Sequence, residues 1–117
     1  MENNETAIEM SDSAIGSTGA KCVGAAVAFC TNLKEMRLSN CEIKDTGAKA
    51  LFDEIVNSRS VTLLDLSRNP LTEKCFDSLI ALLNKNTTLK SVMLYDINVK
   101  NKLAWSKLKA HADRVKH

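Results

Sequence analysis

One apolar pattern recurs along the whole sequence at a fixed interval, and this repeat limits the possible folds more than any other feature. Shifting the chain by 28 places Met36 on Leu64 and Leu38 on Leu66, and the same apolar columns extend to residues 8–10 and 92–94. Four such units account for nearly all of the 117 residues. Because a unit of this size cannot bury its apolar side alone, successive units are expected to stack. The repeat therefore predicts a solenoid.

Each unit changes its hydrophobic period halfway, which predicts its local structure. Residues 33–38 and 61–66 alternate apolar and polar side chains like a half-buried strand, whereas residues 45–56 and 73–83 space apolar side chains as a helix does. Every strand follows a helix and enters in the same direction, which predicts a parallel sheet with helices on one side. Since helices are about twice as wide as the roughly 4.8 Å between strands, the stack is expected to curve, with the sheet on the concave side. Three polar residues near the expected helix starts are predicted to cap free N–H groups: Ser17, Asp45 and Thr72.

Residues 15–26 contain a glycine, serine, threonine and lysine run that superficially matches a phosphate-binding loop. The spacing is wrong, because Gly16 and Gly19 are only three residues apart and Cys22 stands where a magnesium-binding hydroxyl is required. The same run returns at residues 46–49, one repeat further on. It is therefore interpreted as part of the repeat, and no nucleotide or other cofactor is expected.

Residues 33–43, LKEMRLSNCEI, and residues 61–71, VTLLDLSRNPL, resemble the leucine-rich repeat family. The length of the unit, with its full helix, is similar to the ribonuclease-inhibitor subclass of that family. The resemblance implies a short α/β solenoid with a parallel concave sheet and convex helices. Asn69 stands at the family's asparagine position and Cys41 is the permitted variant. The resemblance implies that these two form a structural ladder, hydrogen-bonding the backbone where the strands end.

The stretch from Leu83 to Leu94 is also similar to the tropomodulin C-terminal domain, to Ran GTPase-activating protein and to NOD-like receptor repeats. The main functional hypothesis is a non-catalytic protein-protein interaction module that forms part of a larger repeat protein or of a cytoplasmic or cytoskeletal assembly. Two alternatives follow from the resemblance: tropomodulin-like binding of actin filaments, and a fragment of a Ran-type GTPase-activating regulator. The repeat array is short for the second alternative, and no matching catalytic arginine or asparagine can be placed.

We expect residues 1–5 to be disordered, residues 6–99 to form the repeats and residues 100–117 to form a basic C-terminal capping helix. This last segment carries six basic residues and one acidic residue. Four of its apolar side chains fall on one helical stripe, which predicts a cap over the last core edge: Trp105, Leu108, Ala112 and Val115.

No comparable cap precedes the first unit, so the edge formed by residues 6–32 is a possible site of self-association or of docking on a larger assembly. A charge at Val23 or Val27 is expected to abolish such association.

Catalytic, metal-binding and membrane functions are not expected. The four cysteines lack the spacing of a zinc site and are interpreted as reduced, mostly buried thiols. The two histidines, His111 and His117, have no partner pattern and are predicted to be surface residues. No stretch of 18 or more apolar residues occurs and the start is polar and acidic, which favours a cytoplasmic protein.

Residues between the core positions of each strand are expected to form columns on the concave face, because parallel strands in register align equivalent positions. The alternating charges of Glu9, Arg37 and Asp65 allow two interpretations, a ladder of surface ion pairs or a recognition strip. Apolar and aromatic side chains in the C-terminal half favour recognition of another protein. The predicted protein-binding residues are Glu9, Arg37, Leu63, Asp65, Arg68, Met93, Tyr95 and Asp96. This face has no basic stripe and few aromatic residues, so a nucleic acid is not an expected partner.

Overall fold

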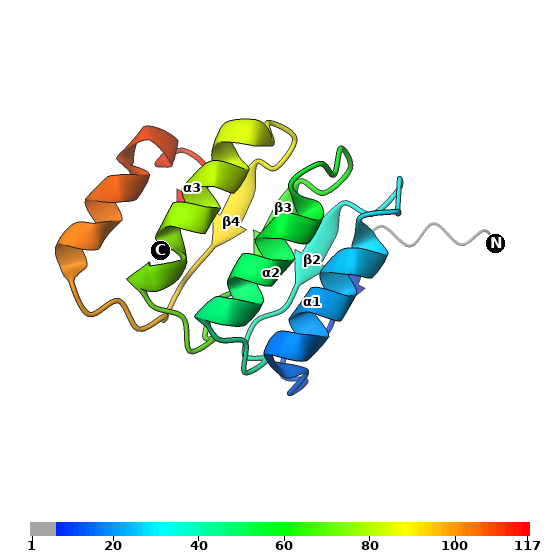
Figure 1. The fold of residues 1–117 in the computed structure, drawn as a ribbon, viewed down its shortest axis with the longest axis horizontal. Coiled ribbons are helices and arrows are strands. Elements are labelled where there is room, and N and C mark those ends of the chain that lie inside the picture. The colour runs from blue at the N-terminus through cyan, green and yellow to red at the C-terminus, as the bar shows by residue number, and fades with distance from the viewer. Residues whose placement is uncertain (1–6) are drawn as a thin grey trace.

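Five parallel strands lie side by side in the order β1-β2-β3-β4-β5 and form one sheet (Figure 1). The computed structural model describes residues 7–117, and the expected disorder of residues 1–5 lies outside this range. The strands are β1 (Ala7–Glu9), β2 (Glu35–Arg37), β3 (Leu63–Asp65), β4 (Ser91–Met93) and β5 (Val115–Lys116). The helices are α1 (Gly16–Val27), α2 (Asp45–Ile55), the 3-10 turn η1 (Glu73–Cys75), α3 (Phe76–Lys85) and the 3-10 helix η2 (Lys102–His111).

The pairing register of the first four strands follows the repeat. Ile8 pairs with Met36, Met36 with Leu64 and Leu64 with Val92, each exactly one repeat further along the chain. The helices all cover the same face of the sheet, as Figure 1 shows. The fold class predicted from the sequence is thus confirmed as a short α/β solenoid with a parallel sheet on one side and helices on the other.

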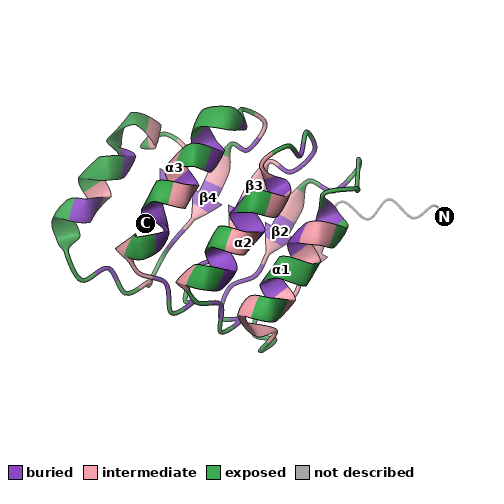
Figure 2. Ribbon diagram, in the orientation of Figure 1, coloured by how far each residue is buried: buried purple, intermediate pink, exposed green. Residues whose placement is uncertain are grey.

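The core lies between the sheet and the helices, and it is continuous along the solenoid. Figure 2 shows the buried positions recurring on the helices and strands of each unit. Met36, Leu38, Leu64 and Leu66, which define the repeat in the sequence, are all fully buried. The apolar period of each unit therefore marks the residues that contact the units on either side.

The expected helix caps are only partly correct. Thr72 accepts a hydrogen bond from the N–H of Lys74 and so caps η1. Ser17 and Asp45 instead accept from the backbone of the following unit, at the N–H groups of Lys44 and Thr72. Since a neighbouring unit lies directly beside each helix start, these side chains join two units rather than cap their own helix.

The prediction of a single capping helix over residues 100–117 is wrong. The segment forms the 3-10 helix η2, a turn and then the short strand β5. A 3-10 helix has three residues per turn, so Trp105, Leu108 and His111 share one side. Ala112, which the expected stripe included, is exposed, whereas Val115 is buried because it lies on a strand and not on a helix.

Strand β5 extends the sheet beyond the repeat. It pairs in parallel with β4 through Val92–Val115 and Met93–Lys116, which is a shorter step along the chain than the one between the earlier strands. The chain end thus forms a shortened fifth unit, in which η2 packs beside α3 and β5 covers the edge of β4. In residues 7–117, no helix combines the length and the apolar character needed to cross a membrane.

We predict that Leu66→Ala lowers the free energy of unfolding by about 2–5 kcal/mol, because Leu66 is 0% exposed and the stacked units cannot close the cavity. Leu103→Ala is the matched control, since Leu103 is 78% exposed on η2 and its truncation should change stability by no more than about 0.5 kcal/mol. Urea unfolding followed by circular dichroism measures both. Equal effects of the two substitutions would contradict the core described here.

Candidate protein-binding surface

The concave face is the side of the sheet opposite the helices, and the predicted columns lie on it in the predicted register. Glu9 pairs with Arg37, Arg37 with Asp65 and Asp65 with Met93. Lys116 of β5 continues this column beside Met93, which the sequence did not indicate. The face therefore presents a row of alternating charge that ends at a methionine and a lysine.

Apolar side chains gather at the C-terminal half of this face. Leu63 on β3 and Met93 on β4 are partly exposed, and their strands are adjacent. Tyr95, two residues beyond Met93, is 44% exposed. Tyr95 lies in the turn directly after β4, so it continues the C-terminal end of the strand that carries Met93.

The backbone around Tyr95 is held on both sides. Its N–H donates to Ser67 Oγ at 2.9 Å, and its carbonyl accepts from the N–H of Arg68 at 2.8 Å. Ser67 itself is buried. The phenol ring therefore projects from a fixed backbone, which lowers the entropy lost when it is immobilised against a partner.

The charged column does not form the ladder of cross-strand ion pairs that was one interpretation of the sequence. Arg37 pairs along its own strand with Glu35, at 3.0 Å. Glu9 and Asp65 accept from the N–H groups two residues ahead, Ser11 at 2.8 Å and Ser67 at 3.0 Å. Hydrogen bonds from Ser11 hold the pKa of the Glu9 carboxyl below its usual value. These carboxylates thus stabilise the turns that end β1 and β3.

Arg68 and Asp96 belong to a column of turn residues with left-handed backbone. Asp12, Asn40, Arg68 and Asp96, each one repeat apart, have φ angles of 67°, 52°, 58° and 56°. Asn40 also donates to Asp12 Oδ1 at 2.8 Å. Aspartate and asparagine tolerate this conformation better than most residues, and arginine is the exception in the column. The turn places the exposed Arg68 and Asp96 at the rim of the concave face.

Asn69 bonds both its own unit and the preceding one. Its Oδ1 accepts from the N–H groups of Cys41 at 2.8 Å and Ile43 at 3.0 Å. Its Nδ2 donates to the carbonyls of Leu38 and Leu66. Cys41 stands one unit earlier, and its thiol donates to the carbonyl of Met10 at 3.0 Å. Burial raises the pKa of the Cys41 thiol, so it stays a neutral donor.

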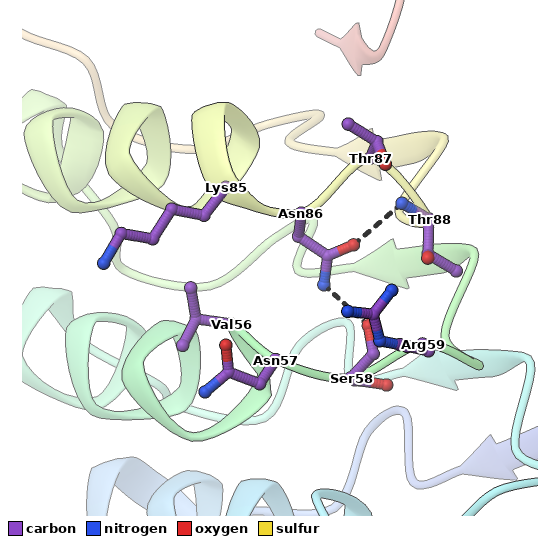
Figure 3. A pocket seen from close by; sticks show the side chains of 8 residues that line it. All are labelled: Val56, Asn57, Ser58, Arg59, Lys85, Asn86, Thr87 and Thr88. Atoms are coloured by element: carbon purple, nitrogen blue, oxygen red, sulfur yellow. Dashed lines mark hydrogen bonds between the residues drawn. The ribbon is translucent and has the colours of Figure 1, made fainter.

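A second column at the opposite end of the strands was missed in the sequence. Ser58 Oγ accepts from the N–H groups two and three residues ahead, and Asn86 Oδ1 does the same one unit later. Figure 3 shows the bond from the Thr88 N–H to Asn86. Asn86 Nδ2 also donates to the carbonyl of Ser58 at 3.0 Å. Arg114, one further repeat length on, donates to the carbonyls of Asn86 and Leu89. The 28-residue spacing of these three positions was visible in the sequence, but a serine, an asparagine and an arginine are chemically too different to be recognised as equivalent.

His117 is exposed and His111 partly exposed, as expected of surface residues, but both have partners that the sequence did not indicate. His111 Nε2 lies 3.0 Å from Asn84 Oδ1, and its Nδ1 lies 3.1 Å from Arg114 Nη2. A neutral ring with its proton on Nε2 satisfies both contacts, because arginine can only donate. His117 stacks on Trp105 with ring centroids 3.7 Å apart. Trp105 in turn packs against Phe76 at 5.0 Å, so the C-terminal residues are tied to α3.

Comparison with known proteins agrees with this geometry. The sequence model of the family described as Leucine Rich repeat matches residues 29–52. Residues 29–52 thus match a leucine-rich repeat, and the fold of the chain is that of a short leucine-rich-repeat solenoid. Among solved structures it is similar to "Leiomodin-1 Actin-Binding Site 2 (ABS2)", with a TM-score of 0.82 and 20% identity, over 95% of this chain and 69% of that one. At this identity the likeness shows a shared fold. No curated protein matches the sequence.

The four cysteines divide into two exposed and two buried thiols, which corrects the expectation that most are buried. Cys22 and Cys30, on α1 and just after it, are exposed, whereas Cys41 and Cys75 are buried. Burial, reinforced by the charge of Asp45, raises the pKa of the Cys75 thiol to about 12. Among the residues that the structure describes, no group of three or more histidine, cysteine or acidic side chains is arranged to hold a metal ion.

We predict that two thiols per native chain react with dithionitrobenzoate within minutes at pH 8, and four after unfolding in guanidinium. Exposed thiols supply thiolate to the reagent, whereas Cys41 and Cys75 are both protonated and shielded. In the matched variant Cys22→Ser/Cys30→Ser, the rapid phase should disappear. Rapid reaction of all four thiols in the native protein would mean that the units do not stack as described.

Proposed function

We propose that the chain is a non-catalytic protein-interaction module that binds its partner through the C-terminal half of the concave face, and that the partner is actin. The observation that carries the proposal is the group formed by Leu63, Met93 and Tyr95. Leu63 and Met93 are partly exposed on the adjacent strands β3 and β4, and Tyr95 is exposed in the turn after β4, on an otherwise polar face. Aromatic and apolar anchors within a polar rim are typical of protein interfaces.

The charged residues around this group would act as its rim. Arg37, Asp65 and Lys116 flank it along the paired column, and Arg68 and Asp96 flank it at the turns. Charges of both signs favour a partner surface of mixed charge and set its orientation more than its affinity. A uniformly charged polymer fits such a rim poorly.

Actin is proposed from the likeness to the leiomodin-1 domain, whose title describes an actin-binding site. The similarity extends over 95% of this chain. Because a shared fold alone does not carry a shared function, actin binding needs its own test. The cytoplasmic location that this partner requires stays a prediction from the sequence.

We predict that the chain cosediments with filamentous actin and that Tyr95→Ser raises the dissociation constant at least tenfold, since removing an anchor of an interface costs roughly 1.4 kcal/mol or more. Leu103→Ser is the matched control, because Leu103 is also exposed but lies on η2 in the helix layer. Its affinity should equal that of the wild type. Arg68→Asn tests the rim without straining the turn, since Asn40 already occupies the equivalent position.

Absence of actin binding by the folded wild type would remove actin as the partner. Equal binding by Tyr95→Ser and Leu103→Ser would instead place the actin site on another surface. The Ran-type alternative is distinguished by measuring GTP hydrolysis by the small GTPase with and without the chain. An accelerated rate would contradict the non-catalytic module proposed here.

Self-association is a second candidate property, favoured by incomplete burial in the first unit. Ile8, Met10, Ile15 and Val23 are only partly buried, although their equivalents one unit later are fully buried. Those equivalents are Met36, Leu38, Ile43 and Leu51. Strand β1 also stands at the edge of the sheet. Val27, expected on this edge, is instead fully buried inside the chain and cannot report on association.

We predict that sedimentation equilibrium shows a monomer-dimer equilibrium at micromolar concentrations, and that Val23→Asp gives monomer only. A charge on a half-buried edge would have to be desolvated on association. The control is Val56→Asp, since Val56 is also partly buried but follows α2, away from this edge. A monomeric wild type across a hundredfold concentration range would contradict self-association.

A further inference from the structure

The two ends of the helix layer differ in charge. The loops that lead from each helix into the next strand, each taken with the last residue of its helix, carry five basic residues and one acidic residue. The loops at the opposite end, each taken with the first residue of its helix, carry four basic and five acidic residues. We call the basic end the helix-to-strand rim. Its charged residues are Lys34, Arg59, Lys85, Lys90, Arg114 and the acidic Asp113.

Three cavities open along the helix-to-strand rim, and they share lining residues. The first, about 280 Å³, lies between residues 28–31 and 57–60. The second, about 250 Å³, lies between residues 56–59 and 85–88. The third, about 340 Å³, is lined by Thr87, Lys90 and residues 113–114. Because Arg59 lines the first two and Thr87 the last two, the cavities are neighbours along the rim, and we refer to the three together as the groove.

The middle cavity has a fixed floor and basic walls (Figure 3). Asn86 is buried beneath it and bonded to both flanking loops, so the floor does not depend on a ligand. Arg59 and Lys85 are exposed on opposite sides, one from each loop. Arg114 is already engaged by backbone carbonyls. The bases exposed to a ligand are therefore Lys34, Arg59, Lys85 and Lys90.

The N-terminal end of the groove is apolar instead of basic. Phe29 is 89% exposed at this end, where its equivalents in the next two units are Asn57 and Lys85. Ala28 and Cys30, on either side of it, line the first cavity. The groove thus changes from apolar to basic as it runs from the first unit toward the last.

We propose that this groove binds an extended acidic polypeptide segment with an apolar side chain at one end. Carboxylates would pair with Arg59, Lys85 and Lys90, and the apolar side chain would pack on Phe29. A polypeptide fits better than a phosphate polymer because the groove offers hydroxyl acceptors at Thr87 and Thr88 beside its donors, and a peptide N–H can donate to them whereas a phosphodiester has no donor. Helices α2 and α3 end here, and their partial negative charge opposes any anion, so the basic side chains must outweigh it.

The length of the segment follows from the geometry of the stack. The groove crosses three gaps between successive loops, and units repeat at roughly 5 Å on the sheet side and about 10 Å on the helix side. An extended chain spans about 3.4 Å per residue, so roughly five to nine residues fill the groove. The inference uses a different surface from the concave face, so each can fail without the other.

The test uses fluorescein-labelled ten-residue peptides of Glu, Asp and Ser, with a leucine pair at the first or at the last position, so that the chain direction is not assumed. We expect one of them to bind the wild type in fluorescence anisotropy at low salt, and to weaken as salt rises because the charges are screened. Arg59→Glu/Lys85→Glu should weaken binding at least tenfold. The matched control, Lys44→Glu/Lys74→Glu, reverses two exposed charges near the helix starts and should bind like the wild type.

The apolar end has its own test. Phe29→Ser should weaken binding of the peptide that carries the leucine pair. Binding of a control peptide of Glu, Asp and Ser without leucine should be unaffected. The proposal would be overturned if the wild type bound neither of the two leucine-containing peptides. It would also be overturned if the two charge-reversal variants lost peptide affinity to the same extent. Tighter binding of a single-stranded oligonucleotide or of anionic lipid vesicles would also overturn it, in favour of a phosphate ligand. Tyr95→Ser should retain peptide binding, which separates this groove from the concave face.

Discussion

Every part of this structure depends on each unit supplying hydrogen-bond partners and apolar contacts to the next. Asn69 is the clearest example, because its buried side-chain amide forms hydrogen bonds with backbone groups of two successive units. Asp45 joins units at the helix starts, and Asn86 joins them at the opposite loops. Backbone groups buried without partners would cost several kcal/mol together, so these columns make stacking in one register a condition of folding.

The regular spacing made much of the fold predictable. A constant repeat length fixes the strand register, and hence which side chains share a column on the concave face, without knowledge of any single contact. The C-terminal unit was not predictable in the same way, because β5 follows β4 with a different step and η2 is not an α-helix. Beyond the last 28-residue repeat, the spacing of apolar residues does not show whether Val115 lies on a helix or on a strand.

The candidate sites were predictable in position but not in chemistry. The sequence placed Glu9, Arg37 and Asp65 side by side, yet their hydrogen bonds run along each strand. Side-chain pairing depends on rotamers and on competing backbone donors, and the alignment of repeat positions gives information on neither. The helix-to-strand rim was invisible for a related reason: its bases come from four separate loops that only the folded stack brings together.

The two ends of the solenoid are closed differently, and this gives the molecule a direction. At the C-terminal end, β5, Trp105 and the bonds of Arg114 cover the last repeat. At the N-terminal end of the described residues, the apolar side chains of the first unit are only partly buried. Helix α1 nevertheless packs closely on α2, where a Cβ at Gly47 would lie 2.6 Å from Ser17. The first unit is therefore held to the stack through its helix, while its apolar residues remain available to a further surface placed beside them.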